Sequence, residues 1–232
     1  GASAGNDITT GIKNTLLGAH AGDHLTESNF NVAIGYLALD ADTKGSGSTA
    51  LGLQALTTQN FTSATTTYNV AVGFQAGMSI TTGIQNTLIG GLAGDNLHAS
   101  SDNVAVGYAS LSGNVGGQNN VAVGPYSLQH FTVGSGNTFN TAIGSQAGSG
   151  SSVTGSNNTW LGGYAGQYAT SAHSTIFIGY LAGRNASTGV RNIGIGAGSM
   201  ENGTISGEDN VSVGHNSGNQ MSTGSNNTLV GA

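Results

Sequence analysis

The side chains that could do chemistry are few: ten carboxylates and six histidines in a chain of 232 residues. Glycoside hydrolysis needs two carboxyl groups about 5 to 10 Å apart. Asp40 with Asp42, and Glu208 with Asp209, are close enough in sequence to form such a pair. Both pairs lie in variable polar stretches, where solvated carboxylates are ordinary. We therefore predict no catalytic residue and no enzyme activity.

Two histidines could ligate a metal. His20 and His24 flank Asp23 in the stretch AHAGDH, and a spacing of four residues suits zinc when it falls on a helix. No helical periodicity surrounds them, so exposed histidines in a turn are the expectation. The chain has no cysteine, which excludes thiolate ligands and disulfides. We predict no metal site and no cofactor.

The composition excludes several classes of partner. Charged residues make up 6% of the chain, against about 25% in an ordinary soluble domain. The net charge is −6 with only four basic residues, so a footprint for nucleic-acid phosphates is absent. No apolar run approaches the ~20 residues that span a bilayer. We expect neither nucleic-acid binding nor membrane insertion.

These scattered side chains are carried by an internal repeat. The pentapeptide NVAVG occurs at Asn69–Gly73, Asn103–Gly107 and Asn120–Gly124. Its glycine, called the marker glycine below, recurs mostly every 17 residues, with longer intervals of 21 between Gly52 and Gly73 and 20 between Gly124 and Gly144. The marker glycines are Gly18, Gly35, Gly52, Gly73, Gly90, Gly107, Gly124, Gly144, Gly162, Gly179, Gly196, Gly214 and Gly231.

Each repeat predicts a short strand before its marker glycine. The residue just before the glycine is branched aliphatic, and the residue two earlier is β-branched, which favours strands. Residues two apart share a face, so we expect this pair to point into the core, with Val106 and Val123 stacked on their equivalents. The middle residue, usually Ala but Trp160 and Phe177 in two repeats, should then point outward.

The rest of the repeat completes a coil. Weaker apolar positions and Ala-Gly bends predict a second short strand and two turns in each repeat. The near-constant Asn four residues before the marker glycine should stack on itself along the axis, as amide side chains do in cross-β assemblies. The sequence therefore predicts an all-β fold, a parallel β-solenoid (β-roll) with 17-residue coils. Such narrow coils bury little, so association is expected to cover a second face.

The repeat resembles known fibrous proteins. NVAIG (31–35) is similar to the repeats of the left-handed β-roll in YadA-like trimeric autotransporter heads. NTAIGSQAG (140–148), followed by TGSNNT (154–159), resembles repeats of bacteriophage tail fibres still more. The resemblance implies a left-handed, homotrimeric solenoid in a virion tail fibre that takes part in host attachment.

Other interpretations stay open at this point. The head of a bacterial trimeric adhesin, on the cell surface, would carry the same repeat, and an ice-binding solenoid or a glycan-cleaving tailspike is less favoured. Residues 4–14 match residues 76–86, so the chain begins inside a repeat. We expect residues 1–232 to be one solenoid segment of about thirteen repeats, cut from a longer fibrous protein.

Aromatic residues are the candidate ligand-binding positions. Some follow the marker glycine by one or two residues, and others lie in the two longer repeats, where loops added to a regular scaffold often carry function. Their rings suit a host surface glycan or a protein receptor, although packing between coils or chains would use the same residues. The candidates are Tyr36, Phe74, Tyr108, Tyr126, Tyr164, Tyr180, Phe61, Tyr68, Phe131 and Phe139.

Overall fold

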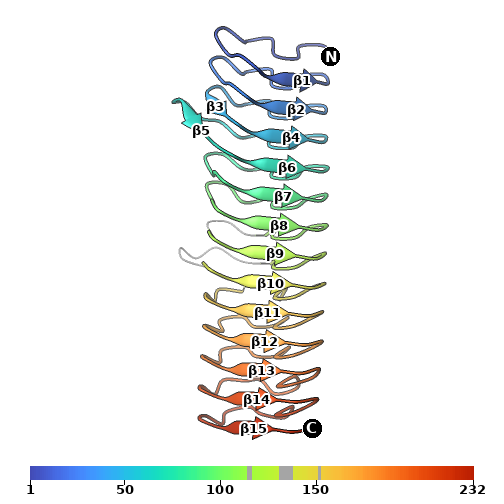
Figure 1. The fold of residues 1–232 in the computed structure, drawn as a ribbon, viewed down its shortest axis with the longest axis vertical. Coiled ribbons are helices and arrows are strands. Elements are labelled where there is room, and N and C mark those ends of the chain that lie inside the picture. Colours follow the sequence, from blue (N-terminus) through green and yellow to red (C-terminus); the bar gives the residue numbers. More distant parts are fainter. Residues whose placement is uncertain (114–116, 131–137, 151–152) are drawn as a thin grey trace. The chain divides into compact units, whose positions relative to one another are not determined.

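The computed structural model describes residues 1–113, 117–130, 138–150 and 153–232. The chain divides into two compact units, Gly1–Gly116 and Gly117–Ala232, and each is a parallel β-solenoid (Figure 1). Nowhere in the described ranges is there a helix long and apolar enough to cross a membrane.

The strands are short and almost uniform in length. Those of the first unit are β1 (Thr15–Leu17), β2 (Val32–Ile34), β3 (Gly45–Ser46), β4 (Thr49–Leu51), β5 (Thr65–Thr66), β6 (Val70–Val72), β7 (Thr87–Ile89) and β8 (Val104–Val106). Those of the second are β9 (Val121–Val123), β10 (Thr141–Ile143), β11 (Thr159–Leu161), β12 (Ile176–Ile178), β13 (Ile193–Ile195), β14 (Val211–Val213) and β15 (Thr228–Val230).

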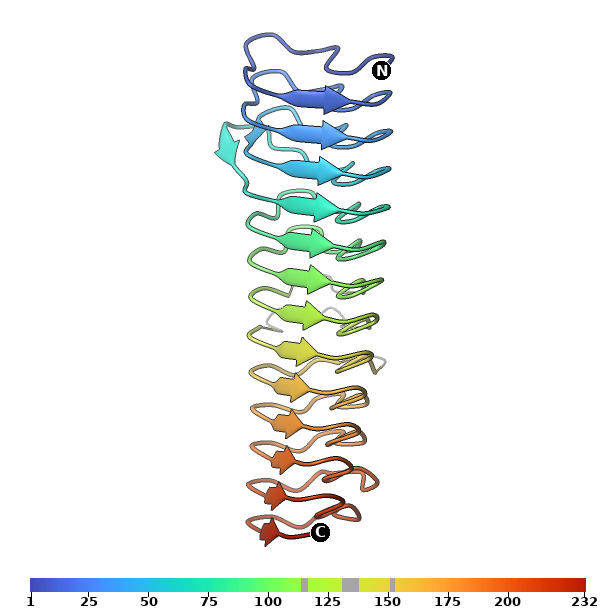
Figure 2. The ribbon, with the colours of Figure 1, turned by 45° about the vertical axis from the view of Figure 1, so that its right-hand side comes forward.

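Within each unit, each three-residue strand pairs in parallel with the equivalent strand of the next coil. The register matches equivalent positions of the repeat, as where Val32, Ala33 and Ile34 of β2 face Thr49, Ala50 and Leu51 of β4. Within each unit the strands line up along one side of the coil (Figure 2). The predicted all-β, parallel solenoid with 17-residue coils is confirmed.

The prediction of two strands per coil is wrong for most coils. Outside the column of three-residue strands, the described residues form one small sheet, in which β3 pairs with β5. The remaining backbone turns because each coil holds several residues with positive φ, such as Leu37 at 56° and Leu39 at 53°. None of the non-glycine residues with positive φ in the described chain is β-branched, since that conformation is costly for such side chains.

The predicted assignment of strand faces is also wrong. The middle residue of each strand points into the coil: Ala105, Ala122, Trp160 and Phe177 are fully buried. The aliphatic residues on either side, Val106 and Val123 among them, are only half-buried and face outward. Successive side chains of a strand point to opposite faces, so each three-residue strand places one residue inside the coil and two outside it.

Core volume is divided between two positions in several coils. In four coils the middle strand residue is Ala and the fourth residue after the marker glycine is a buried Leu, as at Ala105 and Leu111, whereas the coils of Ala71 and Ala142 have Gly77 and Gly148 at that position. Where the middle residue is Phe177, that fourth position is Gly183, and a Cβ there would lie 2.3 Å from Phe177 Cγ. Close packing of interiors explains the exchange, because added volume must be removed elsewhere.

The marker glycines allow the coils to approach closely. Gly90 has a φ of +135°, and a Cβ on it would lie 2.5 Å from the carbonyl oxygen of Gly107 in the next coil. Only glycine satisfies both conditions, which explains why the residue recurs in every coil.

The predicted Asn stacking is confirmed as a buried hydrogen-bonded ladder. The backbone N–H of Asn86 donates to Asn69 Oδ1 at 2.9 Å, and the N–H of Asn103 donates to Asn86 Oδ1 at 3.1 Å. Asn86 Nδ2 also donates to the carbonyl of Ser100 at 2.9 Å. Each side chain therefore satisfies buried backbone groups in neighbouring coils.

We expect Asn86→Ala to lower the free energy of unfolding by roughly 2 to 3 kcal/mol, because it removes the acceptor used by the N–H of Asn103 and leaves Ser100 O without this donor. Chemical denaturation measures the loss. Asn96→Ala is the matched control, since its side chain bonds Ser112 O at an exposed site, and it should cost less than about 1 kcal/mol. Equal losses in the two variants would contradict a structural role for the ladder.

Candidate functional site

The two carboxylate pairs considered for hydrolysis each bond to other groups. Glu208 and Asp209 both bind Arg191: its Nη2 lies 2.9 Å from Glu208 Oε2, and its Nε lies 2.6 Å from Asp209 Oδ1. Asp42 is fully buried, whereas Asp40 is partly exposed. Neither pair presents two carboxylates to a common cleft of the described structure.

Asp42 anchors the first long repeat. Its Oδ1 accepts the backbone N–H groups of Gly45 at 3.0 Å and Phe61 at 3.1 Å, and its Oδ2 accepts Gln59 Nε2 at 2.6 Å. Burial raises the pKa of the Asp42 carboxyl, and these hydrogen bonds oppose that shift. The longer repeat is therefore tied into the core through a buried polar network.

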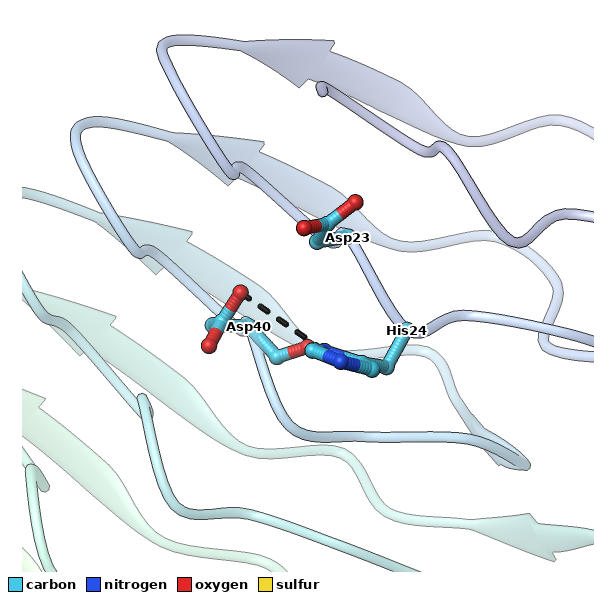
Figure 3. A group of neighbouring side chains, drawn as sticks. All are labelled: Asp23, His24 and Asp40. Carbon is cyan, nitrogen blue, oxygen red and sulfur yellow. Dashed lines mark hydrogen bonds and ion pairs between the residues drawn. The ribbon is translucent and has the colours of Figure 1, made fainter. Parts of the chain in front are cut away.

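Asp23, His24 and Asp40 form the one group of three potential metal ligands in the described residues, with ligand atoms within 4.8 Å of one another (Figure 3). His24 Nδ1 lies 3.0 Å from the Asp40 carbonyl and 3.8 Å from its Oδ1. His20 Nδ1 lies 2.9 Å from Asp23 Oδ2. Each carboxylate thus already has an imidazole beside it, which matches the prediction of turn histidines.

The buried carboxylate oxygens of this group reflect a position in the coil. Asp23 and Asp40 are both fifth after a marker glycine, and each has a buried Oδ1 without a hydrogen-bond partner. Asp95 occupies the same position in another coil and has the same orphaned oxygen. The orphaned oxygens therefore do not single out a metal centre.

Asp95 makes the stability of the first unit depend on pH. Burial raises the pKa of its carboxyl from the ordinary 3.8 to about 6. The folded state holds the proton more tightly than the unfolded state, so stability should fall as pH rises from about 4 to about 6.

We expect Asp95→Asn to melt at a higher temperature than the parent chain at pH 7, and at nearly the same temperature at pH 4. Asn keeps the shape without the charge, and Asn219 occupies the equivalent position of another coil. Thermal unfolding at both pH values measures the effect, with the exposed Asp102→Asn as control. A difference of the same size at both pH values would rule out titration of Asp95 as its cause.

The aromatic candidates that follow marker glycines lie at the surface. Tyr36, Phe74, Tyr108 and Tyr180 are 51 to 57% exposed. Tyr126 and Tyr164 lie one residue further along the repeat. Tyr126 is 36% exposed, and Tyr164 is half-buried.

One group of these rings forms a shallow pocket. Tyr164 and Tyr180 pack edge to face with ring centroids 6.0 Å apart. With Leu181 and Arg184 they line a hollow of about 230 Å³. Arg184 is held there by Gln167, whose Oε1 accepts from Nε at 3.0 Å.

The aromatic candidates of the two long repeats differ in placement. Phe61 is 7% exposed and packs in the core, so its ring is not available at the surface. Tyr68 and Phe139 are 64% and 61% exposed. Phe131 lies outside the described residues.

A larger pocket lies where the first long repeat meets its neighbours. It has a volume of about 400 Å³ and is lined by Asn29, Phe30, Ser46, Gly47, Thr66 and Tyr68. Sequence reasoning selected Tyr68 but not Phe30 or Gly47. The sequence does place these three residues together. Each is the fifth residue before a marker glycine, so they occupy the same corner of successive coils.

The outward face of the strands is a continuous uncharged surface in each unit. Every coil contributes two residues, aliphatic or Thr, and none is charged. Several of the aliphatic ones are well exposed, including Leu51 and Ile89 at 41% in the first unit and Leu161 at 43% in the second. Contiguous apolar surface of this kind marks a site of association.

Comparisons with protein-family models, curated proteins and solved structures each found no match for this chain.

Proposed function

We propose that this chain is a structural and adhesive segment of a homotrimeric fibre of the phage tail-fibre kind, which takes part in host attachment. The observation that carries the proposal is the uncharged aliphatic face along the outside of the strands. A parallel sheet is ordinarily buried on both faces, and its strands are apolar on both. Here the coil covers one face and leaves the other open.

A second copy of the same chain is the partner that fits this face. Its two residues per coil, each aliphatic or Thr, repeat at the spacing of the strands, about 4.8 Å. A copy in parallel alignment has the same spacing, so contacts made in one coil are repeated in the next. The face also carries no charge that would repel its own copy. The number three, the left-handed turn and the location in a virion rest on the resemblance of the repeats to those of tail fibres.

Mass in solution tests the assembly. Light scattering coupled to size exclusion should give three times the 22.8 kDa of one chain. A stable folded species of 22.8 kDa would refute it.

The adhesive role needs a separate test. Fluorescently labelled protein should remain on susceptible bacterial cells after washing, and unlabelled protein should compete for the same sites. A trimer that no cell in a broad bacterial panel retains would be a spacer only. The head of a bacterial adhesin would rely on the same surfaces. The full sequence of the gene would distinguish a phage tail fibre from a bacterial adhesin.

A further inference from the structure

The corner that contains Phe30 and Tyr68 has the same backbone in every coil. The residue fifth before the marker glycine has positive φ, 59° at Phe30, 80° at Gly47 and 51° at Tyr68. Its side chain is free to differ, because the same place is taken by Gln85 and Asp102 in later coils. At this corner the backbone conformation is therefore the same in every coil, while the side chain varies from coil to coil.

Gly47 opens a gap in that column. It lies between Phe30 of the preceding coil and Tyr68 of the following one, and it has no side chain to fill the space between them. Two coil steps place the Cα atoms of Phe30 and Tyr68 roughly 10 Å apart. A saturated ring that contacts an aromatic ring on each side needs about 7 to 8 Å between the planes of those two aromatic rings. A Cβ placed on Gly47 would lie 3.6 Å from Tyr68 Cδ1, an ordinary van der Waals contact, so the space over Gly47 can hold a carbon ring against the Tyr68 ring.

The two rings are exposed and available to a ligand. Phe30 is 58% exposed and Tyr68 is 64% exposed. Lys13 Nζ lies 4.9 Å from the Phe30 centroid and belongs to the coil before Phe30, whereas the pocket lies towards the coil after it. A cation over an aromatic ring is favourable and helps to hold Phe30 in place.

The polar groups of the pocket are hydroxyls. Ser46 Oγ accepts the backbone N–H of Asn29 at 2.9 Å, which leaves its own proton for another acceptor. Thr66 adds a second hydroxyl from β5, the strand supplied by the long repeat. The residues that line the pocket carry no charge. The pocket therefore combines apolar ring faces with neutral hydrogen-bonding groups.

We propose that this pocket binds one neutral pyranose unit of a glycan between Phe30 and Tyr68, an inference that rests on the proposed attachment function. The C–H groups of a pyranose face carry slight positive charge and suit the negative face of an aromatic ring. Its hydroxyls suit Ser46 and Thr66. An anionic sugar would find no cation among the lining residues, so the neutral sugar is the better match.

Binding at a single pocket should be weak, on the order of millimolar. In a homotrimer the pocket occurs three times, and a multivalent glycan surface would bind more tightly through avidity. We therefore expect attachment to cells through this pocket to require the homotrimer, whereas a single chain should still bind the free sugar.

The scaffold supplies matched variants. Asn occupies this corner with positive φ at Asn119, Asn157 and Asn226, so Asn is tolerated there. Phe30→Asn and Tyr68→Asn each remove one ring, and Gly47→Asn fills the gap while both rings stay. Phe139→Asn removes an exposed ring at the same corner in the second unit and is the control.

The probes are the methyl glycosides of glucose, galactose, mannose and N-acetylglucosamine, measured by saturation-transfer NMR up to about 50 mM, well above a millimolar dissociation constant. We expect at least one to bind, and each of Phe30→Asn, Tyr68→Asn and Gly47→Asn to weaken it at least tenfold. Phe139→Asn should bind as the parent does.

Three results would overturn the inference. The first is that the parent chain binds none of the four probes. The second is sugar binding that Gly47→Asn and Tyr68→Asn leave unchanged, which would place the sugar elsewhere. The third is binding of N-acetyl-tryptophanamide but of no glycoside at this pocket, which would indicate a protein receptor. A trimer without sugar binding contradicts this inference alone, and a monomer that binds sugar contradicts the proposed fibre alone.

Discussion

A chain carrying Ala122→Asp is expected to lose its folded structure in the second unit. Ala122 is fully buried in the middle of β9 and faces Ala142 of the next strand across the ladder. A carboxyl group at this position would have no partner in an apolar interior, whether it stays ionised or takes up a proton, and its side chain would not fit, so the change should cost more than about 4 kcal/mol. Circular dichroism during thermal unfolding measures the loss.

Val123→Asp, one residue along the same strand, should behave differently. Val123 faces outward and is half-buried in the single chain. We expect the coil to keep its secondary structure, although it should melt at a lower temperature without its partners, and the chain to elute at the mass of one copy, because like charges would meet on the faces that associate. An unfolded Val123→Asp beside a folded Ala122→Asp would show that the inner and outer faces are exchanged.

The strands themselves could be predicted from the sequence. The residues chosen as strand positions, such as Val70 to Val72 and Val104 to Val106, are strands in the structure. A β-branched residue, a small residue and an aliphatic residue before a glycine specify an extended segment locally. Repetition at 17 residues then specifies parallel pairing between equivalents, because any other register would break the glycine and Asn columns.

The faces of the strands could not be assigned in the same way. VAV is apolar at every position, and TAL places Thr and Leu on the same face, so alternation of polar and apolar residues does not distinguish the two faces. Side-chain size favoured the branched residues for the core, because larger side chains bury more area. In the structure the middle residue of each strand is the inner one, whatever its size, and the branched residues form the outer face.

A second signal in the sequence does distinguish the faces. A Leu six residues later occurs only where the middle residue is Ala, as at Ala33, Ala50 and Ala105, and large middle residues such as Trp160 and Phe177 have a Gly at that distance, although two Ala coils have Gly there too. Volume is exchanged between two positions only when both face the same cavity. The pattern therefore marks the middle residue as an inner one.

The Phe30–Tyr68 pocket was beyond sequence reasoning for a geometric reason. Its two rings are 38 positions apart, and the pocket exists only because they share a corner and Gly47 separates them. The burial of Phe61 was equally hidden. It follows from the placement of Asp42 within hydrogen-bonding distance of the Phe61 backbone, which depends on how the longer repeat folds back.

The exchange of core volume makes a strong test in the second unit. Phe177→Ala should destabilise by about 3 to 5 kcal/mol, because it leaves a cavity beside Gly183 and Gly194. Gly183→Leu should destabilise by about 3 kcal/mol, since its side chain would overlap the Phe177 ring. Chemical denaturation of both single variants and of the double variant measures the coupling between the two sites.

The double variant should recover most of the stability that either single change removes. It places Ala in the strand and Leu at the facing position, as the coil with Ala105 and Leu111 does. The backbone suits the exchange, because Gly183 has a φ of 60° and Leu111 has a φ of 54°.

We expect a favourable coupling free energy of about 3 kcal/mol between the two substitutions. Combining Gly183→Leu with Ile178→Ala is the control, because Ile178 lies on the outer face of the same strand and its removal creates no space inside the coil. That pair should show no rescue. Losses that simply add in the Phe177→Ala, Gly183→Leu variant would mean that the two positions do not share one cavity, and the assignment of the inner face would fail with them.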